Sequence, residues 1–273
     1  MPDASLHARA GRALHAGAGD VVVVRAAIAP LHHEARISSM QTSQALAGHA
    51  LVVDAREGDW LQVRGGDDYP GWVHAGYVLD ADAALGPDRA SWHARAELSL
   101  GCTVRGPHGR RALPAGALLL PGERRESGET VSAEACDERF PARPEAIVAG
   151  ALALFEGTSY QWGGVTPWGA DCSGLAQLAF ALHGVPLPRD AWQQALEGED
   201  AGTDPLALGA ADLLFFSDRA DGRITHVGVA LGDGRMAHLA LGRGGWAVDR
   251  LDDVADPYVA MLRRNFRHAR RVV

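Results

Sequence analysis

Residues 160–180 read YQWGGVTPWGADCSGLAQLAF and place Cys172 directly ahead of an apolar pattern with helical spacing. The segment SGLAQLAFALHG is predicted to form a helix that ends at Gly184. The free N–H groups in the first turn of such a helix would point at the sulfur and lower the pKa of the thiol. A neighbouring imidazolium would lower it further. The position of Cys172 therefore predicts a nucleophilic cysteine. The glycines that flank it are expected to let a substrate backbone approach closely: Gly163, Gly164, Gly169 and Gly174.

Composition excludes several classes of partner. The chain has 273 residues, a formal charge of −8 and a pI of about 5.8, so neither nucleic acid nor anionic lipid is an expected partner. The basic stretch LRRNFRHARRVV at residues 262–273 is predicted to be a last strand with a solvated edge or tail. No apolar run approaches the roughly 20 residues of a membrane span, so no membrane partner is expected. Residues 1–24 lack the ordered regions of a signal peptide, and we expect a cytoplasmic protein.

The remaining cysteines and the histidines show no metal-ligand spacing. Three cysteines occur without a CxxC pair, and twelve histidines occur without an HExxH motif. We therefore predict neither a metal site nor any other cofactor. Cys102 and Cys136 are expected to be small buried or half-buried thiols.

The first half of the chain has the pattern of small β-barrels. Short β-rich segments separated by Gly, Asp and Pro run from Val21 to about residue 80. Within them, EGDWLQVRGGDDYPGWVHAGYV (57–78) resembles a bacterial SH3-like (SH3b) domain. We predict an N-terminal arm at 1–20, a first SH3b-like barrel at 21–82 and a second, from weaker motifs, at 88–141. The proline-containing linker RFPARPEA then marks a boundary before a final domain at 144–273.

The final domain has an α+β pattern. PEAIVAGALALFEG (144–157) and the segment behind Cys172 are predicted helices. AADLLFFSD (210–218), ITHVGVALGDGRMAHLAL (224–241), WAVDRL (246–251) and PYVAMLRRN (257–265) are predicted strands. Helices followed by adjacent strands are typical of an α+β domain.

Two histidines of one predicted hairpin are candidates for the base that a thiol needs. If residues 232–234 form a three-residue loop, Gly228 lies opposite His238, and His226 shares a face with His238 one diagonal step away. Such neighbours have Cα atoms roughly 7–8 Å apart. His226 can then act as general base while His238 orients it. Taken singly, either histidine is more commonly a strand residue with satisfied partners.

The loop length decides this geometry. In the three-residue loop Leu231 pairs with Arg235. A two-residue Asp-Gly loop would instead put the histidines on opposite faces of the hairpin. The sequence permits both.

The order Y-x-W-G-G-x-x-x-x-G-x-D-C-S-G, LPRD, ADLLFF and THVGVALGDGRMAHLA closely resembles the NlpC/P60 family of papain-like cysteine peptidases. This resemblance covers residues from about 144 to the end. It implies that Cys172 is the nucleophile, His226 the base and His238 the third, polar member. Ala211 departs from the pattern, since the family often has glycine there; the following Asp212 is expected to be structural.

The resemblance also implies a set of substrate-binding residues. Tyr160, Asp171 and Ser173 match positions that line substrate subsites, although Tyr160 could be a packed aromatic whose hydroxyl caps a turn. Asp190 matches a carboxylate that helps to hold the free α-amine of a terminal L-alanine, as a buried ammonium needs such a partner. Ala191 stands where a serine often follows, which removes one hydrogen bond.

In relatives with SH3b domains, the first of these domains closes one end of the cleft. Glu34 and Tyr69 match the residues that do so; otherwise they are a solvated loop acid and a barrel aromatic. The resemblance thus implies a peptidase that cleaves the γ-D-glutamyl–diamino acid bond of free L-Ala-γ-D-Glu murein peptides during cell-wall recycling. The alternatives are an exported hydrolase of intact cell wall and a non-catalytic module that binds wall fragments.

Overall fold

A computed structural model describes residues 14–86 and 89–273, and most of the predicted N-terminal arm, residues 1–13, lies outside the described residues. The chain divides into two compact units, Met1–Ala133 and Glu134–Val273. Among the described residues, no helix has the length and apolar character that crossing a bilayer requires.

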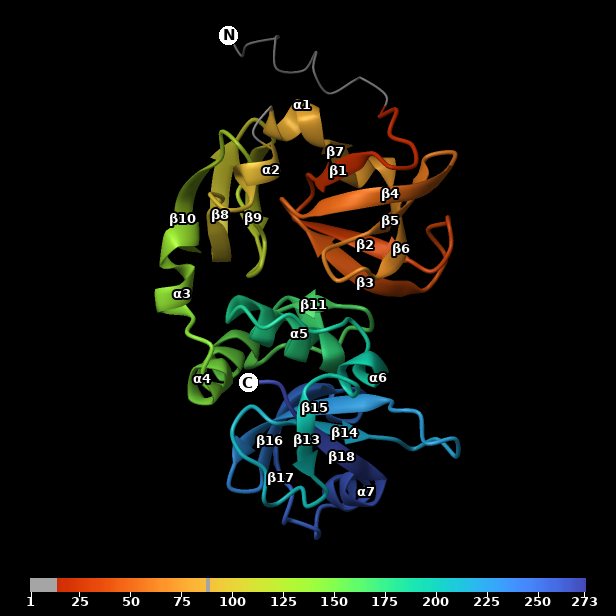
Figure 1. The fold of residues 1–273 in the computed structure, drawn as a ribbon, viewed down its shortest axis with the longest axis vertical. Helices are drawn as coiled ribbons and strands as arrows, with labels where there is room; N and C mark the ends of the chain where they lie inside the picture. The colour runs from red at the N-terminus through yellow and green to blue at the C-terminus, as the bar shows by residue number, and fades with distance from the viewer. Residues whose placement is uncertain (1–13, 87–88) are drawn as a thin grey trace. The chain divides into compact units, whose positions relative to one another are not determined.

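The first part of the N-terminal unit is an antiparallel sheet with the order β3-β2-β6-β5-β4-β1-β7 (Figure 1). Its inner face is built from alternating small apolar side chains such as Val22, Val24, Leu61 and Val63, which are fully buried. One strand escaped prediction because its sequence QTSQAL is mostly polar. The elements are β1 (Val21–Val24), β2 (Ile28–His32), β3 (Gln41–Leu46), β4 (Ala50–Glu57), β5 (Trp60–Arg64), β6 (Pro70–His74), η2 (Ala75–Tyr77) and β7 (Val78–Asp80).

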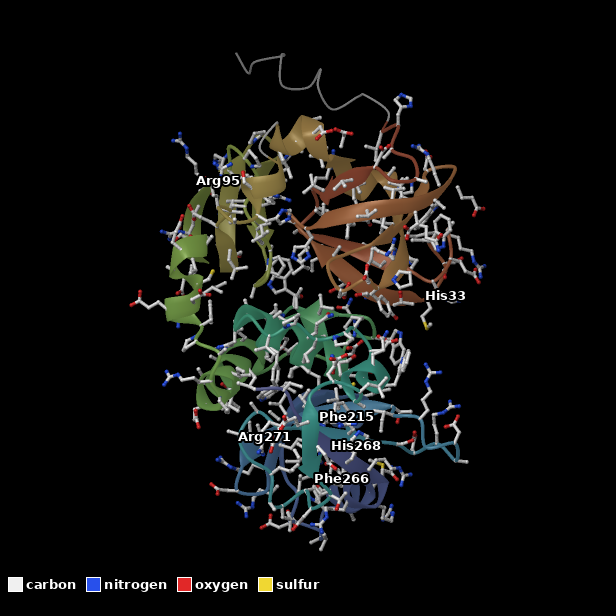
Figure 2. All side chains as sticks on the ribbon, in the orientation of Figure 1. His33, Arg95, Phe215, Phe266, His268 and Arg271 are labelled. Carbon is white, nitrogen blue, oxygen red and sulfur yellow. The ribbon has the colours of Figure 1, made fainter. Side chains whose placement is uncertain are left out.

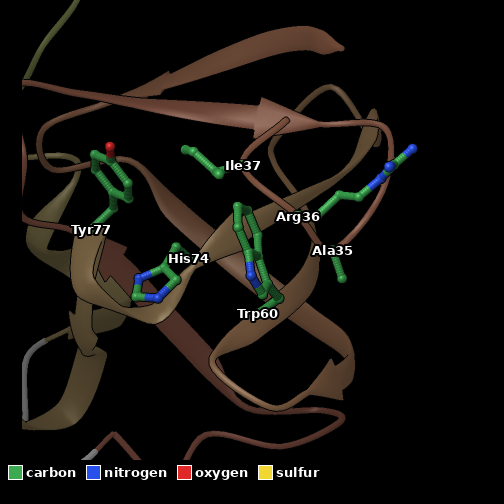
Figure 3. A pocket seen from close by; sticks show the side chains of 6 residues that line it. All are labelled: Ala35, Arg36, Ile37, Trp60, His74 and Tyr77. Atoms are coloured by element: carbon green, nitrogen blue, oxygen red, sulfur yellow. The ribbon is translucent and has the colours of Figure 1, made fainter. Parts of the chain in front are cut away.

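This sheet carries an aromatic pocket of about 540 Å³ on its surface (Figure 3). Trp60 forms its floor and makes edge contacts with His32 and His74, each with ring centroids 5.4 Å apart. Ile37, 72% exposed, stands at the rim. The pocket therefore belongs to the first part of the N-terminal unit alone.

The second part of the N-terminal unit is a three-stranded sheet, β10-β8-β9, within the described residues. A second closed barrel is thus not confirmed. The apolar segment 118–120 adds only an isolated antiparallel bridge, between Leu118 and Leu98. Leu118 and Leu120 pack with Val23 and Trp92, and the Leu118 N–H donates to Ala47 O at 2.8 Å. The elements are α1 (Ala81–Leu85), α2 (Arg89–Trp92), β8 (Leu98–Gly106), β9 (Gly109–Leu113) and β10 (Arg124–Val131).

The C-terminal unit places helices against an antiparallel sheet of order β13-β18-β14-β15-β16-β17 (Figure 1). Helix α5 packs on α4 and on strands β15 and β16. The helices and turns are η3 (Ala133–Ala135) at the boundary, α3 (Cys136–Arg139), α4 (Pro144–Phe155), α5 (Cys172–Leu182), α6 (Ala191–Gln194), η4 (Leu241–Arg243) and α7 (Pro257–Asn265). The strands are β11 (Val165–Thr166), β12 (Gly169–Ala170), β13 (Glu199–Gly202), β14 (Leu213–Phe216), β15 (His226–Gly232), β16 (Arg235–Ala240), β17 (Gly245–Arg250) and β18 (Phe266–Arg271).

The prediction of a strand at residues 257–265 is wrong, because this segment forms helix α7. Its start carries two helix signals: the Asp256 side chain accepts from Tyr258 N, and Pro257 occupies the first turn. Arg263 and Arg264 in the last turn interact favourably with the negative end of the helix dipole.

The C-terminal strand is also not a solvated edge. Strand β18 lies between β13 and β14. His268 of β18 packs on Phe215 with centroids 5.4 Å apart, and Phe266 packs on Phe216 at 5.6 Å (Figure 2).

The turn of the β15–β16 hairpin differs from the predicted three-residue loop, although His226 and His238 still lie on one face of the sheet. Gly232 pairs with Arg235, so the loop has two residues, Asp233 and Gly234, both with positive φ. Pairing of Leu231 with Arg235 is therefore wrong. The register shifts between Ala230 and Gly232, which leaves residue 231 unpaired as a bulge.

The bulge restores the register that the two-residue loop would have lost. Val229 pairs with Ala237, which continues to Gly228 opposite His238. His226 and His238 consequently share one face.

Ala211 precedes β14 in a left-handed conformation, with φ of 63°. Its N–H donates to Ala230 O at 2.9 Å. The next side chain, Asp212, is fully buried and accepts from Gly209 N and, at 2.8 and 2.7 Å, from Arg271. This geometry explains why glycine suits position 211, since an L-residue there is strained.

Replacing Ala211 with Gly should leave the free energy of unfolding nearly unchanged, because relief of left-handed strain offsets the added flexibility of the unfolded chain. The matched control is Ala149→Gly, exposed within α4, which should lose about 0.5–1 kcal/mol. Urea denaturation measures both variants. An equal loss at the two positions would contradict a strained Ala211.

Candidate active site

Cys172 is the first residue of α5, and Asp171 is its N-cap. One carboxylate oxygen of Asp171 accepts from Gly174 N, and the other accepts from Gly163 N, each at 2.8 Å. The first turn of the helix is thereby tied to the loop that precedes it.

Arg189, in the segment before α6, also holds the side chain of Asp171. Its side chain is 1% exposed and binds both oxygens of Asp171, at 3.0 and 2.7 Å. It also donates to Ser173 Oγ at 2.8 Å, while Gln194 Nε2 donates to Ser173 O at 3.1 Å. The polar groups on both sides of Cys172 are therefore fixed by buried partners.

The glycines near Cys172 serve backbone packing. A Cβ at Gly174 would lie 2.1 Å from Gly164 O, and a Cβ at Gly164 would lie 2.3 Å from Gly169 O. Only glycine permits α5 and the β11–β12 pair to approach this closely. The close approach involves the protein's own backbone, whereas the sequence led us to expect a role toward substrate.

Cys172 is 9% exposed, and its helix α5 packs on β15. The backbone N–H groups of Val227 and Ser173 lie close enough to the sulfur to favour its thiolate form. Because Val227 directly follows His226, this contact brings the thiol to the strand that carries the candidate base.

The pKa of the thiol differs from the sequence-based expectation. Burial, with a smaller contribution from Asp171, raises the pKa of Cys172 to about 12 and outweighs the helix N-terminus. Burial, followed by the neighbouring His238, lowers the pKa of His226 to about 3. Both directions favour a neutral thiol beside a neutral imidazole near pH 7.

The two histidines are directly hydrogen-bonded, with 2.8 Å between His226 Nε2 and His238 Nδ1. The ring of His238 is fully buried, and its Nε2 lies 3.0 Å from Asp249 Oδ2. The bond at Nε2 of His226 leaves Nδ1 as the ring nitrogen available to a thiol.

Asp249 was missed by sequence reasoning. His238 pairs with Ala247 across β16 and β17, so Asp249 lies two residues along on the same face. The alternation of apolar and polar residues in WAVDRL placed Asp249 on one face of a strand. That this face carries His238 follows only when the register of both hairpins is known.

Tyr160 is half-buried near the thiol. Burial raises the pKa of its hydroxyl well above the ordinary value, and the proximity of Cys172 and Asp171 adds to the effect. The hydroxyl is therefore a neutral hydrogen-bond donor at physiological pH.

Asp190 is the N-cap of α6 and is partly exposed. Its Oδ2 accepts from the indole N–H of Trp192 at 3.0 Å, and its own N–H donates to Gln193 Oε1 at 3.1 Å. The ring of Trp192 in turn stacks under Arg223, with 4.9 Å from the guanidinium carbon to the ring centroid.

Glu34 and Tyr69 belong to the N-terminal unit. The Glu34 carboxylate pairs with Arg36 Nε at 2.5 Å and is 51% exposed. Tyr69 lies in the turn before β6, where its N–H donates to Asp67 Oδ1 at 3.2 Å. Their part in closing a cleft stays a prediction.

The structure brings the other candidate residues into one unit: Cys172, His226, His238, Tyr160, Asp171, Ser173 and Asp190. Asp171 and Ser173 are buried and held by Arg189, so their visible role is to fix the helix start. Cys102 is buried and Cys136 half-buried, both as free thiols. Within residues 14–86 and 89–273, no cluster of three or more His, Cys, Asp or Glu residues has the arrangement of a metal site.

Comparison with known families identifies residues 157–262 as matching the NlpC/P60 family. The chain carries an NlpC/P60 domain. Residues 31–76 match the bacterial dipeptidyl-peptidase SH3 domain. The catalytic unit of this chain therefore has the papain-like NlpC/P60 fold, preceded by an SH3-like domain.

Two curated relatives are gamma-D-glutamyl-L-lysine dipeptidyl-peptidases. The Bacillus subtilis protein is 28% identical over 220 residues, covering 72% of this chain and 71% of its own length. The Bacillus cereus protein is 29% identical over 226 residues, covering 72% of this chain and 66% of its own length. Among solved structures, an NlpC/P60 family protein from Bacillus cereus has a TM-score of 0.74 at 19% identity, covering 92% of this chain and 99% of that one; this likeness concerns the fold.

Replacing Arg189 with Met should lower the free energy of unfolding by about 3–5 kcal/mol, because the Asp171 carboxylate would stay buried without its charged partner. The matched control is Arg219→Met, whose partner Asp221 and own side chain are both more than half exposed; it should cost less than about 1 kcal/mol. Urea denaturation compares the two. Similar losses would show that the buried pair does not hold the helix start.

Proposed function

We propose that this chain is a cysteine peptidase that hydrolyses the γ-D-glutamyl–diamino acid bond of free murein peptides beginning with L-Ala-γ-D-Glu. The observation that carries the proposal is Cys172 at the start of α5, with its sulfur near the amide that follows His226, and the 2.8 Å hydrogen bond between His226 and His238. This constellation lies in an NlpC/P60 domain, and the relatives' names give the bond class.

The proposed reaction begins with attack of the Cys172 sulfur on the γ-carbonyl carbon of D-glutamate. The thiol proton passes to Nδ1 of His226, which avoids a lone buried charge on either group. The positive end of the α5 dipole stabilises the negative oxygen that forms on the carbonyl.

Collapse of this intermediate breaks the C–N bond, and His226 returns the proton to the departing amine of the diamino acid. A thioester to Cys172 remains. Water then attacks the thioester, with His226 accepting its proton, and the sulfur leaves as the L-Ala-D-Glu acid is released.

The amine end of the substrate is assigned to Asp190, the N-cap of α6. An ammonium group enclosed at a cleft end requires a carboxylate partner, and Asp190 supplies one. Such a subsite would reject stem peptides still linked to sugar, because their N-terminus is an amide. This selectivity supports a cytoplasmic enzyme that recycles released wall peptides.

The purified chain should release L-Ala-D-Glu from L-Ala-γ-D-Glu-L-Lys and from the diaminopimelate analogue, while N-acetylated peptide and intact sacculi should be poor substrates. Cys172→Ala should lower kcat at least about 10³-fold, since it removes the nucleophile. Cys136→Ser, outside the site, is the matched control and should retain activity. Chromatography with mass detection follows the products.

Three results would overturn this proposal in different ways. Release of dipeptide from sacculi alone would favour an exported wall hydrolase. Binding of tripeptide without cleavage would favour a wall-fragment binding module. Unchanged turnover in Cys172→Ala would remove the mechanism.

A further inference from the structure

The hydrogen-bond chain that begins at His226 continues past His238 to Asp249. The two links measure 2.8 Å between the histidines and 3.0 Å between His238 Nε2 and Asp249 Oδ2. The three residues come from successive strands β15, β16 and β17. This series of hydrogen bonds therefore runs across three strands of the sheet.

Donors and acceptors in such a chain must alternate, and its far end sets the order. An ionised carboxylate can only accept, so His238 Nε2 must carry the proton. A neutral His238 then has a lone pair on Nδ1, so His226 Nε2 must carry a proton. A neutral His226 consequently presents its lone pair at Nδ1, the nitrogen left for the thiol.

Asp249 is built to remain an acceptor. Asp249 is 8% exposed. Burial alone would raise the pKa of its carboxyl, but hydrogen bonds from His238 and Arg243 together hold it below the ordinary value. The carboxylate therefore stays ionised at neutral pH.

Arg243 holds Asp249 in place and shares its charge. Its Nη2 lies 2.8 Å from Asp249 Oδ1 and 2.5 Å from Asp256 Oδ2. The guanidinium stacks on Tyr258 at 4.5 Å, and the ring of Tyr258 in turn faces His238 with centroids 6.2 Å apart. Oδ1 of Asp249 thus accepts from Arg243 Nη2, while Oδ2 accepts from His238 at 3.0 Å and, over a longer 3.4 Å, from Arg243 Nε.

We propose that Asp249 is a positioning residue that acts through His238 to fix both histidine tautomers, so that His226 presents an unprotonated Nδ1 to Cys172. Arg243 is the anchor that fixes which oxygen of Asp249 faces His238. The catalytic consequence rests on the proposed peptidase function, whereas the tautomer assignment does not.

Replacing Asp249 with Asn should reverse the donor and acceptor roles along these hydrogen bonds. Arg243 has only donors, so the amide oxygen takes the closer 2.8 Å contact with Arg243 Nη2. The NH₂ then takes the place of Oδ2, which faces His238 Nε2 at 3.0 Å and Arg243 Nε at the longer 3.4 Å. His238 must then donate from Nδ1 to His226 Nε2. The proton of His226 moves to Nδ1, where it blocks acceptance of the thiol proton.

Nitrogen NMR of the histidine rings tests the tautomers without any turnover. In Cys172→Ala protein, we expect both His226 and His238 to be neutral with the proton on Nε2. Adding Asp249→Asn should move both protons to Nδ1. A doubly protonated His238, or unchanged tautomers in the Asp249→Asn protein, would overturn the proposal whether or not the chain is a peptidase.

Kinetics on the tripeptide test the consequence. Asp249→Asn should lower kcat by about 10²–10⁴-fold, as a wrong tautomer does in a serine-protease triad, with a smaller change in KM. The matched control is Asp252→Asn, which loses an exposed ion pair with Arg250 just beyond β17 and should keep wild-type kcat.

A second variant separates positioning from a structural role. In Asp249→Asn with Arg243→Met, no guanidinium holds the amide oxygen, so the amide can rotate and accept from His238. We expect kcat to rise about tenfold above that of Asp249→Asn alone, a coupling that a double-mutant cycle isolates. A double variant no faster than Asp249→Asn, at equal folded fraction by thermal denaturation, would overturn the role assigned to Arg243. If the wild-type protein cleaved none of the peptides, the proposed function would be contradicted, whereas the tautomers measured by NMR would not be affected.

Discussion

The buried ion pair between Asp171 and Arg189 is the constraint on which the rest of the site depends. A carboxylate inside a protein is tolerated only with full hydrogen bonding, and here it receives bonds from Arg189 and from the N–H groups of Gly163 and Gly174. Because Asp171 is the N-cap, the same bonds fix where α5 begins. The position of Cys172 follows from that starting point.

The second half of the site depends on a single unpaired residue in a hairpin. A two-residue Asp-Gly turn by itself would send His226 and His238 to opposite faces of the sheet. The bulge at residue 231 shifts the register by one residue, and the two rings then form a hydrogen bond of 2.8 Å between His226 Nε2 and His238 Nδ1. The regular pairing of β16 with β17 then places Asp249 on the same face as His238, so the three side chains come together from three strands.

The sequence predicted those elements whose own pattern determines them. Helices α4 and α5 have apolar faces and end at glycines, and β14–β16 are strongly apolar. Helix α7 was mistaken for a strand because Tyr258 and Val259 are β-formers, although the Asp256–Pro257 pair was a start signal.

Features that depend on tertiary neighbours were harder to predict. The burial of Arg189 cannot be read from LPRD, because a buried and an exposed arginine look alike in sequence. The role of Asp249 depends on the register of two hairpins. The raised pKa of Cys172 reflects burial, which outweighs the local helix-terminus effect that the sequence displays.

The central claim is that Cys172, alone among the free thiols, is the nucleophile. Partial alkylation with iodoacetamide, with each cysteine followed by peptide mapping, tests it most directly. The account predicts that loss of tripeptide cleavage follows modification of Cys172 in a one-to-one ratio and that bound substrate slows both. Loss of activity that follows Cys102 or Cys136 instead, or turnover that survives complete modification of Cys172, would contradict it.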